Sequence, residues 1–363
     1  MRSVGDPMHM ADALLSPAVG GTMWAVSAAT IACCSKKVRT GMDDRKIPLM
    51  GVLGAFIFAV QMINFTIPVT GSSGHLGGGL ILSILLGPYA AFLTIASVLV
   101  VQAFFFADGG LLALGCNIFN LGFFPAFIAY PFIYKTIVGS IPAPKRISVA
   151  AIAASVIGLQ LGAFGVVVET VMSGISSLPL SAFAAIMQPI HLAIGVVEGL
   201  VTASVISFVY KAKPEILQNA LEARPIDAHP VRTVVLGFLV VTFLTGGVLS
   251  WFASEHPDGL EWSITKVTGK EELKGPEQGV HAALAALQEK LSFLPDYSFR
   301  KTAEAKTAEM SAAPSAVQEQ NQEGKKSAGD KFGTSVSGIV GGILTLGLSL
   351  LIGFILKRRT HTA

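Results

Sequence analysis

The sequence predicts an all-α fold: a polytopic transmembrane helical bundle of about seven helices, followed by a C-terminal two-helix membrane module with an external loop. Composition is the first indication, because 52% of the 363 residues are hydrophobic, only 13% are charged, and the mean hydropathy is +0.63. Those values exclude an ordinary soluble domain. The length of the apolar stretches is the second indication, because several nearly uncharged stretches reach the roughly 20 residues that a helix needs to cross a bilayer core.

The apolar stretches follow one another along the chain, with basic loops between some of them. The clear spans cover about residues 18–35, 47–63, 116–138, 148–172, 189–210, 234–253 and 336–356, and a longer apolar tract covers 80–107. Lysine and arginine collect after the first, third, fifth and last clear spans, and such loops are cytoplasmic by the positive-inside rule. The small net charge of +3 therefore reflects membrane topology, and no nucleic-acid partner is expected.

The longer tract cannot be one simple crossing. The basic loops on either side of residues 47–138 lie on the same side of the membrane, so this region must cross an even number of times. Gly87-Pro88 offers a break, because proline removes a hydrogen-bond donor and glycine relaxes the backbone. We expect a short helix at about 74–86, with His75 at its half-exposed start, and another at about 89–106. The N-terminus is then outside and the C-terminus cytoplasmic.

Three regions are expected along the chain. Residues 1–7 are interpreted as an extension that begins at a start codon chosen too far upstream, residues 8–225 as a membrane domain, and residues 226–363 as a separate module. The two helices of this module flank an external segment. Its first part carries the Pro-Asp-Gly-Leu-Glu motif at 257–261 and leads into a short amphipathic stretch. Its later part, about 301–331, has the composition of a low-complexity tether.

His75 and the pair Met8-His9 are the candidate metal ligands. His75 lies in the glycine-rich segment Gly71–Gly79 between apolar spans, where an imidazole is costly without a partner. If the mature chain begins at Met8, its amine, the backbone nitrogen of His9 and His9 Nδ1 can chelate one metal ion, and a nitrogen of His75 would complete a planar set. Such a set suits Ni(II) and Cu(II), and holds Co(II) with less discrimination. The residues Met1–Pro7 would remove the amine ligand, so this interpretation depends on a start at Met8.

Other polar side chains lie near predicted helix ends. Six of them are expected either to brace the metal-bearing loop through hydrogen bonds or simply to cap loops: Gln61, Asn64, Ser73, Asp108, Asn117 and Asn120. His191 and Glu198 are seven residues apart and share one face of a helix. Glu198 is expected to face the bundle interior. His191, at the start of that helix, is expected to be an interfacial or structural histidine, with a ligand role as the alternative.

Four ordered blocks of this sequence are similar to one known family. They are Met8-His9 with Asp12 to Pro17, Gln61 to Asn64 with Gly71 to Gly79, Gln102 with Ala107 to Gly110 and Asn117 to Gly122, and His191 with Gly195 to Thr202. Over about residues 8–225 the chain resembles the cobalt/nickel substrate-binding S components of energy-coupling factor (ECF) transporters, the CbiM/NikM group. The region 240–356, with its PDGLE motif, looks like the N component of this system in fused form.

The resemblance implies a subunit that captures Ni(II) or Co(II) outside the inner membrane of a prokaryote, for cobalamin biosynthesis or nickel enzymes. It implies Met8, His9 and His75 as metal ligands and no intrinsic cofactor. It implies as partners a transmembrane coupling (T) component and cytoplasmic ATPase subunits, besides the lipid bilayer. The chain itself has no GxxxxGK[ST] phosphate loop and is not expected to be an enzyme.

Two other functions remain as alternatives. One is an intramembrane metalloenzyme that uses His191 and Glu198, although the chain has no HExxH motif. The other is a self-sufficient secondary metal transporter, which would show inverted repeats that are not evident here. The choice between cobalt and nickel stays open, because selectivity would come from loop geometry.

Overall fold

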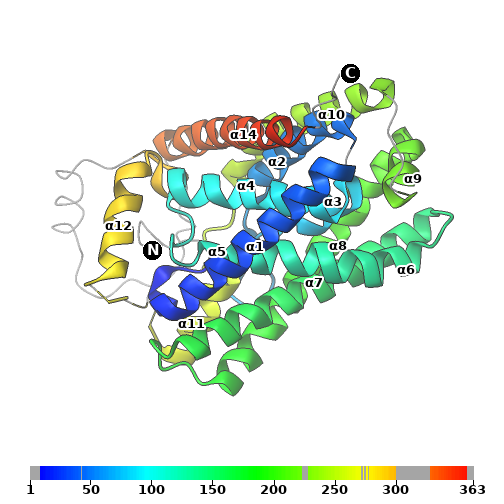
Figure 1. Ribbon diagram of the computed structural model, residues 1–363. Coiled ribbons are helices and arrows are strands. Elements are labelled where there is room, and N and C mark those ends of the chain that lie inside the picture. Colours follow the sequence, from blue (N-terminus) through cyan, green and yellow to red (C-terminus); the bar gives the residue numbers. More distant parts are fainter. Residues whose placement is uncertain are drawn as a thin grey trace.

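The computed structural model describes residues 9–41, 43–222, 228–270, 273, 275–276, 278–299 and 328–357. By length and composition, six helices of this part of the chain can cross a membrane. The predicted all-α transmembrane bundle is therefore confirmed (Figure 1). The predicted extension at 1–7, Met8 and residues 301–327 of the predicted tether lie outside the described residues.

The bundle is built from the first two thirds of the chain. A short 3-10 turn, η1 (Asp12–Leu14), follows the N-terminal segment. The helices are α1 (Pro17–Gly41), α2 (Ile47–Gln61), α3 (Gly79–Leu86), α4 (Pro88–Phe106), α5 (Leu114–Ile118), the π-helical η3 (Phe119–Tyr134), α6 (Lys135–Val138), α7 (Pro144–Ser173), α8 (Leu180–Ala212) and α9 (Pro214–Glu222), with the turn η2 (Asp44–Lys46) before α2. The elements α5, η3 and α6 follow one another directly, so they form the single span expected at 116–138.

The predicted break in the long apolar tract is confirmed. Helix α3 ends at Leu86 and α4 begins at Pro88, while Gly87 between them has a positive φ of 84° that favours glycine. All eight residues of α3 are buried. At about 1.5 Å per residue, α3 is much shorter than the roughly 30 Å thickness of a bilayer core.

The prediction that His75 starts a helix is wrong. The chain before α3 forms a short antiparallel hairpin, β1 (Phe65–Ile67) with β2 (Ser72–Gly74), and His75 lies in the loop after it. The helix begins only at Gly79, because the backbone N–H groups of Gly77 and Gly78 donate to the carboxylate of Glu198 instead of entering a helical pattern. This hairpin is a small addition to the predicted all-α fold.

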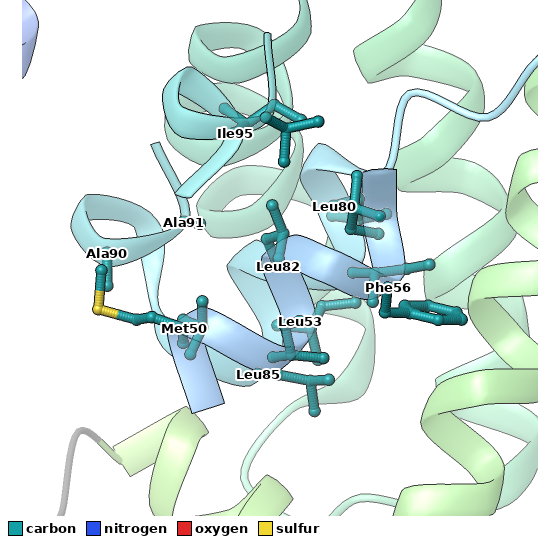
Figure 2. Close-up of a cluster of buried hydrophobic side chains, with 14 of the residues drawn as sticks. Met50, Leu53, Phe56, Leu80, Leu82, Leu85, Ala90, Ala91 and Ile95 are labelled. Atoms are coloured by element: carbon teal, nitrogen blue, oxygen red, sulfur yellow. The ribbon is translucent and has the colours of Figure 1, made fainter. Parts of the chain in front are cut away.

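The main core lies where α2, α3 and α4 meet. Figure 2 shows Met50, Leu53 and Phe56 of α2 against Leu80, Leu82 and Leu85 of α3, with Ala90, Ala91 and Ile95 of α4 nearby; all nine residues are buried. Both α2 and α3 are apolar on nearly every face because other helices surround them. This core holds the glycine-rich loop between two rigid helices.

The C-terminal module packs directly on the bundle. Its helices are α10 (Ala228–Gly247), α11 (Gly259–Thr268), α12 (Val280–Leu291) and α14 (Ala328–Leu356), with short turns η4 (Leu249–Phe252) and η5 (Pro295–Tyr297). Figure 1 shows α14 running along α2 and α4. The predicted turn and amphipathic stretch at the PDGLE motif is α11, whose N-cap Asp258 forms a reciprocal capping box with Glu261. The last helix begins at residue 328, earlier than the predicted 336.

Candidate metal site

A small cavity of about 80 Å³ lies between the N-terminal segment, the glycine-rich loop, η3, α7 and α8. Most of its wall is apolar. Its polar lining comes from regions that are far apart in the sequence: His9, His75, Asn117, Asn120, Ser155, His191, Glu198 and Asp258. The structure thus brings together His9 and His75, the two predicted histidine ligands. Met8, the third predicted ligand, lies outside the described residues.

The N-terminal segment, residues 9–16, is held in place by hydrogen bonds from its backbone to the loop after α4 and to Asn117 of α5. The His9 N–H donates to Asp108 Oδ1 at 3.2 Å. The backbone of Met10 pairs twice with the side-chain amide of Asn117, at 3.2 Å in each direction, and its carbonyl also accepts from Gly110 N at 3.1 Å. These bonds fix the depth at which the segment enters the protein, and so the position of the His9 ring.

Glycine at position 109 permits this close approach. Gly109 has a φ of +82°, and a Cβ atom there would lie 2.9 Å from both His9 Cβ and Asn117 Nδ2. A side chain at this position would strain the backbone and push the N-terminal segment away. The adjacent loop is anchored in turn by Asp12, whose Oδ1 accepts the Ala113 N–H at 2.9 Å.

The surroundings of the His9 ring determine which nitrogen can bind a metal ion. Nε2 lies 3.1 Å from Gln102 Oε1 and 3.9 Å from Asp108 Oδ2, and both oxygens accept hydrogen bonds. The proton is therefore assigned to Nε2, which leaves the Nδ1 lone pair for a metal ion. Burial lowers the pKa of His9, against the opposing effect of the Asp108 carboxylate, and so favours the neutral ring that a metal ion requires.

The His75 ring meets the His9 ring edge to face. The two ring centroids are 5.0 Å apart and the rings are inclined by 82°. His75 Nδ1 lies 3.3 Å from the carbonyl oxygen of Leu76, which can only accept. The proton is thereby assigned to Nδ1, and Nε2 carries the lone pair.

Two buried side chains hold the loop that carries His75. Glu198, on α8, accepts the N–H groups of Gly77 and Gly78 at 3.1 Å each. Gln61, at the end of α2, donates from Nε2 to the carbonyl of Gly77 at 2.9 Å. Glu198 is 3% exposed and faces the bundle interior, where its carboxylate shapes the loop.

The other predicted bracing residues contact different parts of the fold. Ser73 donates from Oγ to the carbonyl of His256 at 2.8 Å and from its N–H to Pro257, which ties the hairpin to the PDGLE segment. The Asn64 carbonyl accepts from Ser254 N at 2.7 Å on the same side. Asn120 lines the cavity but donates to Glu169 Oε2 on α7 at 2.8 Å.

His191 lines the cavity without pairing with Glu198. Its Nδ1 lies 2.8 Å from the carbonyl of Met187, one turn earlier in α8, whereas Glu198 binds the His75 loop. Sequence reasoning placed both residues on one helix face but could not find these partners. It also missed Asp258 in the cavity wall. The only available signal was the PDGLE motif, which was assigned to a separate module.

Side chains alone do not make a metal site in the described part of the chain. No group of three His, Cys, Asp or Glu residues there could hold a metal ion. The described residues offer the His9 and His75 imidazoles, so a nitrogen-rich site at this place needs backbone nitrogens of the N-terminal segment as well.

The amino-acid sequence has clear relatives among known proteins. Residues 9–216 match the protein family described as the cobalt uptake substrate-specific transmembrane region. The chain belongs to this family. Residues 232–358 match the PDGLE domain, so this member of the cobalt-uptake family carries the fused module that the resemblance indicated. Membership makes the chain a multi-pass membrane transport protein rather than an enzyme.

Relatives of this cobalt-uptake family member are named for nickel or cobalt transport. A fused nickel transport protein, NikMN, of Rhodobacter capsulatus is 29% identical over 80% of this chain and 88% of its own length. The cobalt transport protein CbiM of Sorangium cellulosum is 28% identical over 58% of this chain and 95% of its own. A crystal structure of a truncated transition metal transporter is similar in fold, with a TM-score of 0.50, 29% identity, and coverage of 56% of this chain and 98% of that one.

Proposed function

We propose that this chain is the membrane substrate-binding S component of an ATP-driven ECF-type importer, and that it captures Ni(II) or Co(II) outside the cell. The observation that carries the proposal is the meeting of the His9 and His75 rings in a buried cavity. Each ring is oriented by an acceptor on one nitrogen, which is the usual arrangement for a metal-binding histidine.

The proposed metal site combines two side chains with the N-terminal backbone. His9 would bind through Nδ1 and its backbone nitrogen, Met8 through its amine, and His75 through Nε2, so that four nitrogens lie in one plane. Ni(II) favours this geometry, and Co(II) accepts it. The proposal includes a working chain that starts at Met8, because residues before it would turn the amine into an amide.

Transport also needs an energy source outside this chain. We propose a transmembrane T component and cytoplasmic ATPase subunits as partners in the inner membrane of a prokaryote, with the N-terminus of this chain outside and its C-terminus cytoplasmic. Basic loops at one end of the bundle support this orientation. The imported metal would serve cobalamin biosynthesis or nickel enzymes.

Metal titration of the purified chain tests this function. We expect Ni(II) and Co(II) to bind protein that starts at Met8, and His9→Ala and His75→Ala each to weaken binding by at least about tenfold, because each removes a metal–nitrogen bond. His256→Ala is the matched control, since His256 is an exposed histidine in the PDGLE region. Unchanged affinity in His75→Ala would remove this residue from the site.

A second form of the protein tests the amine ligand. Protein that keeps Met1–Pro7 should bind Ni(II) more weakly than protein that starts at Met8, because its Met8 nitrogen is a peptide amide. Calorimetric titration of both forms under identical conditions gives the comparison. Equally tight binding by both would contradict the amine ligand while leaving the two histidines in place.

A further inference from the structure

His191 and Asp258 are potential metal ligands that take no part in the proposed coordination. His191, on α8, and Asp258, the N-cap of α11, both line the cavity that holds His9 and His75. Asp258 is only 4% exposed. Its carboxylate caps α11, which uses one of its roughly four lone pairs, so the others can still bind a cation. The cavity therefore offers an imidazole and a carboxylate besides the proposed metal ligands.

The PDGLE segment lies beside the hairpin that leads to His75. The N–H of Ser73 donates to the carbonyl of Pro257 at 2.8 Å, and Ser73 pairs with Asp258 as in a parallel sheet. The indole N–H of Trp262 donates to a carbonyl in the turn of the hairpin at 3.1 Å. Because Ser73 is two residues before His75, these bonds fix Asp258 next to the loop that carries this metal ligand.

The His191 ring lies against the same segment. Its Nδ1 is 2.8 Å from the carbonyl of Met187, which can only accept, so the proton is assigned to Nδ1 and the lone pair to Nε2. The ring carbon Cε1, which is bonded to Nε2, would lie 3.2 Å from a Cβ atom on Gly259, the residue after Asp258. The nitrogen that can bind a metal ion is thus one bond away from the contact between this ring and the PDGLE segment.

An ion that enters the cavity needs different ligands from an ion that is fully bound. Ni(II) or Co(II) arrives hydrated and doubly charged, and the four-nitrogen set forms only after the backbone nitrogen of His9 has lost its proton. A neutral imidazole and an ionised carboxylate can bind the hydrated ion before that step, and these metals accept both ligands. A buried carboxylate also attracts a dication more strongly than a carboxylate in bulk water does.

The pair of His191 and Asp258 can hold an ion only weakly. In the part of the chain that the structure describes, no three His, Cys, Asp or Glu side chains could hold a metal ion together. Water must therefore fill the other positions around an ion that binds to these two side chains. Such weak binding is what a step on the way to the nitrogen site requires, because the ion must leave again.

We propose that His191 and Asp258 form an entry site for the transition-metal ion. The hydrated ion first binds to His191 Nε2 and the Asp258 carboxylate. Nitrogens of His75 and of the N-terminal segment then replace these two ligands and the remaining water, and the proton of the His9 nitrogen leaves to water. This inference rests on the proposed function, because it assumes that His9 and His75 are the final ligands.

Binding kinetics test the entry site. Full-length protein that starts at Met8 is mixed with Ni(II) in a stopped-flow instrument, and the bound ion is then removed with excess chelator. His191→Phe keeps a ring but removes the nitrogen. We expect association and dissociation both to slow by about tenfold, the effect of one lost ligand interaction, and Kd to stay unchanged. Both rates change equally because His191 binds the ion on the path and not in the final site.

The pattern of the two rates distinguishes an entry site from other roles. A final ligand, or a residue that only supports the fold, would change Kd, because it acts on the end state. A changed Kd in His191→Phe, or two unchanged rates, would overturn the proposal. His256→Phe is the control, because His256 is an exposed histidine of the same segment, and both rates should keep their original values. If His191→Phe does not fold, His191→Ala takes its place with the same expectation.

Asp258→Asn tests the carboxylate. Asparagine is as good an N-cap as aspartate, so α11 should keep its cap while the charge is lost. Association of Ni(II) should slow to a similar degree as in His191→Phe. The variant with both changes should be no slower than the slower single variant, because both changes disable the same site. Additive slowing would contradict a shared site and overturn the proposal.

The outcomes separate this inference from the proposed function. If the unaltered protein binds neither Ni(II) nor Co(II), the proposed function fails. If it binds them and the His191 and Asp258 variants keep the original rates, only the entry site fails and the nitrogen site stands.

Discussion

At the scale of residues, the candidate site depends on how two imidazole rings are oriented. Chelation chemistry alone predicts that His9 and His75 bind the same metal ion. A Met-His terminus offers three nitrogen ligands for a planar set of four, and the histidine in the glycine-rich segment can supply the fourth. Chelation chemistry cannot predict that Gln102 and Asp108 face Nε2 of His9 and so direct Nδ1 toward a metal ion. Those acceptors come from the end of α4 and the loop after it, more than ninety residues away.

The same limit applies to the bracing residues. The sequence identifies Asn117 and Asn120 as neighbours on one helix face, but one binds Met10 and the other binds Glu169. Which partner each amide finds depends on helix packing that a single sequence does not reveal. Polar residue types near helix ends therefore predict that a hydrogen-bond network exists, but the partners of each side chain depend on how the helices pack.

Glu198 gives a prediction at this scale. Glu198→Ala leaves the N–H groups of Gly77 and Gly78 without their acceptor in a buried place, which costs roughly 1–3 kcal/mol for each group. We expect the His75 loop to shift and Ni(II) affinity, measured by titration, to fall at least about tenfold.

Two variants control this experiment. Glu198→Gln keeps one acceptor oxygen and should give an intermediate affinity. Glu215→Ala removes an exposed carboxylate on α9 and should leave affinity unchanged. Equal affinity of Glu198→Ala and the unaltered protein would show that the loop keeps its shape without this carboxylate.

At the scale of elements, the basic loops and the helix-breaking pair Gly87-Pro88 predicted the helix boundaries better than hydrophobic periodicity did. The positive-inside rule and Gly87-Pro88 together predicted the division between α3 and α4, which the structure has. The hairpin before α3 escaped prediction because each strand has only three residues. The start of α3 was misplaced because a tertiary contact from α8, through Glu198, holds Gly77 and Gly78 out of the helix.

The contact between α14 and α2 gives a prediction for these elements. A Cβ atom on Gly341 would collide with the ring of Phe58, so Gly341→Leu should force the two helices apart. We expect a loss of about 1–3 kcal/mol of stability, visible as a lower midpoint of thermal unfolding in detergent.

A second glycine in the same helix is the control for this change. A Cβ atom on Gly347 would have no neighbouring atom within 4 Å, so Gly347→Leu adds the same apolar side chain without a clash. Its unfolding midpoint should stay close to that of the unaltered protein. Equal midpoints for the two variants would mean that α14 does not pack on α2 as described.

At the scale of the whole molecule, the two parts of the chain form one structure around the candidate site. The sequence predicts a separate module, because its composition changes and a polar linker precedes it. In the structure, α10 and α14 pack on α2, Asp258 lies in the cavity wall and Tyr297 reaches Asp108. Such contacts join residues up to about three hundred positions apart, such as Gly51 and Leu350, and nothing in local composition encodes them.

The central claim is that a transition-metal ion is held by nitrogens of the N-terminal segment and His75. X-ray absorption at the nickel edge, on protein that starts at Met8 and carries one Ni(II), tests it most directly. We expect four nitrogen ligands in a plane, two of them imidazoles. In the His75→Ala variant, any Ni(II) that stays bound should have only one imidazole ligand. A sulfur ligand, or a six-coordinate spectrum that His75→Ala leaves unchanged, would contradict it.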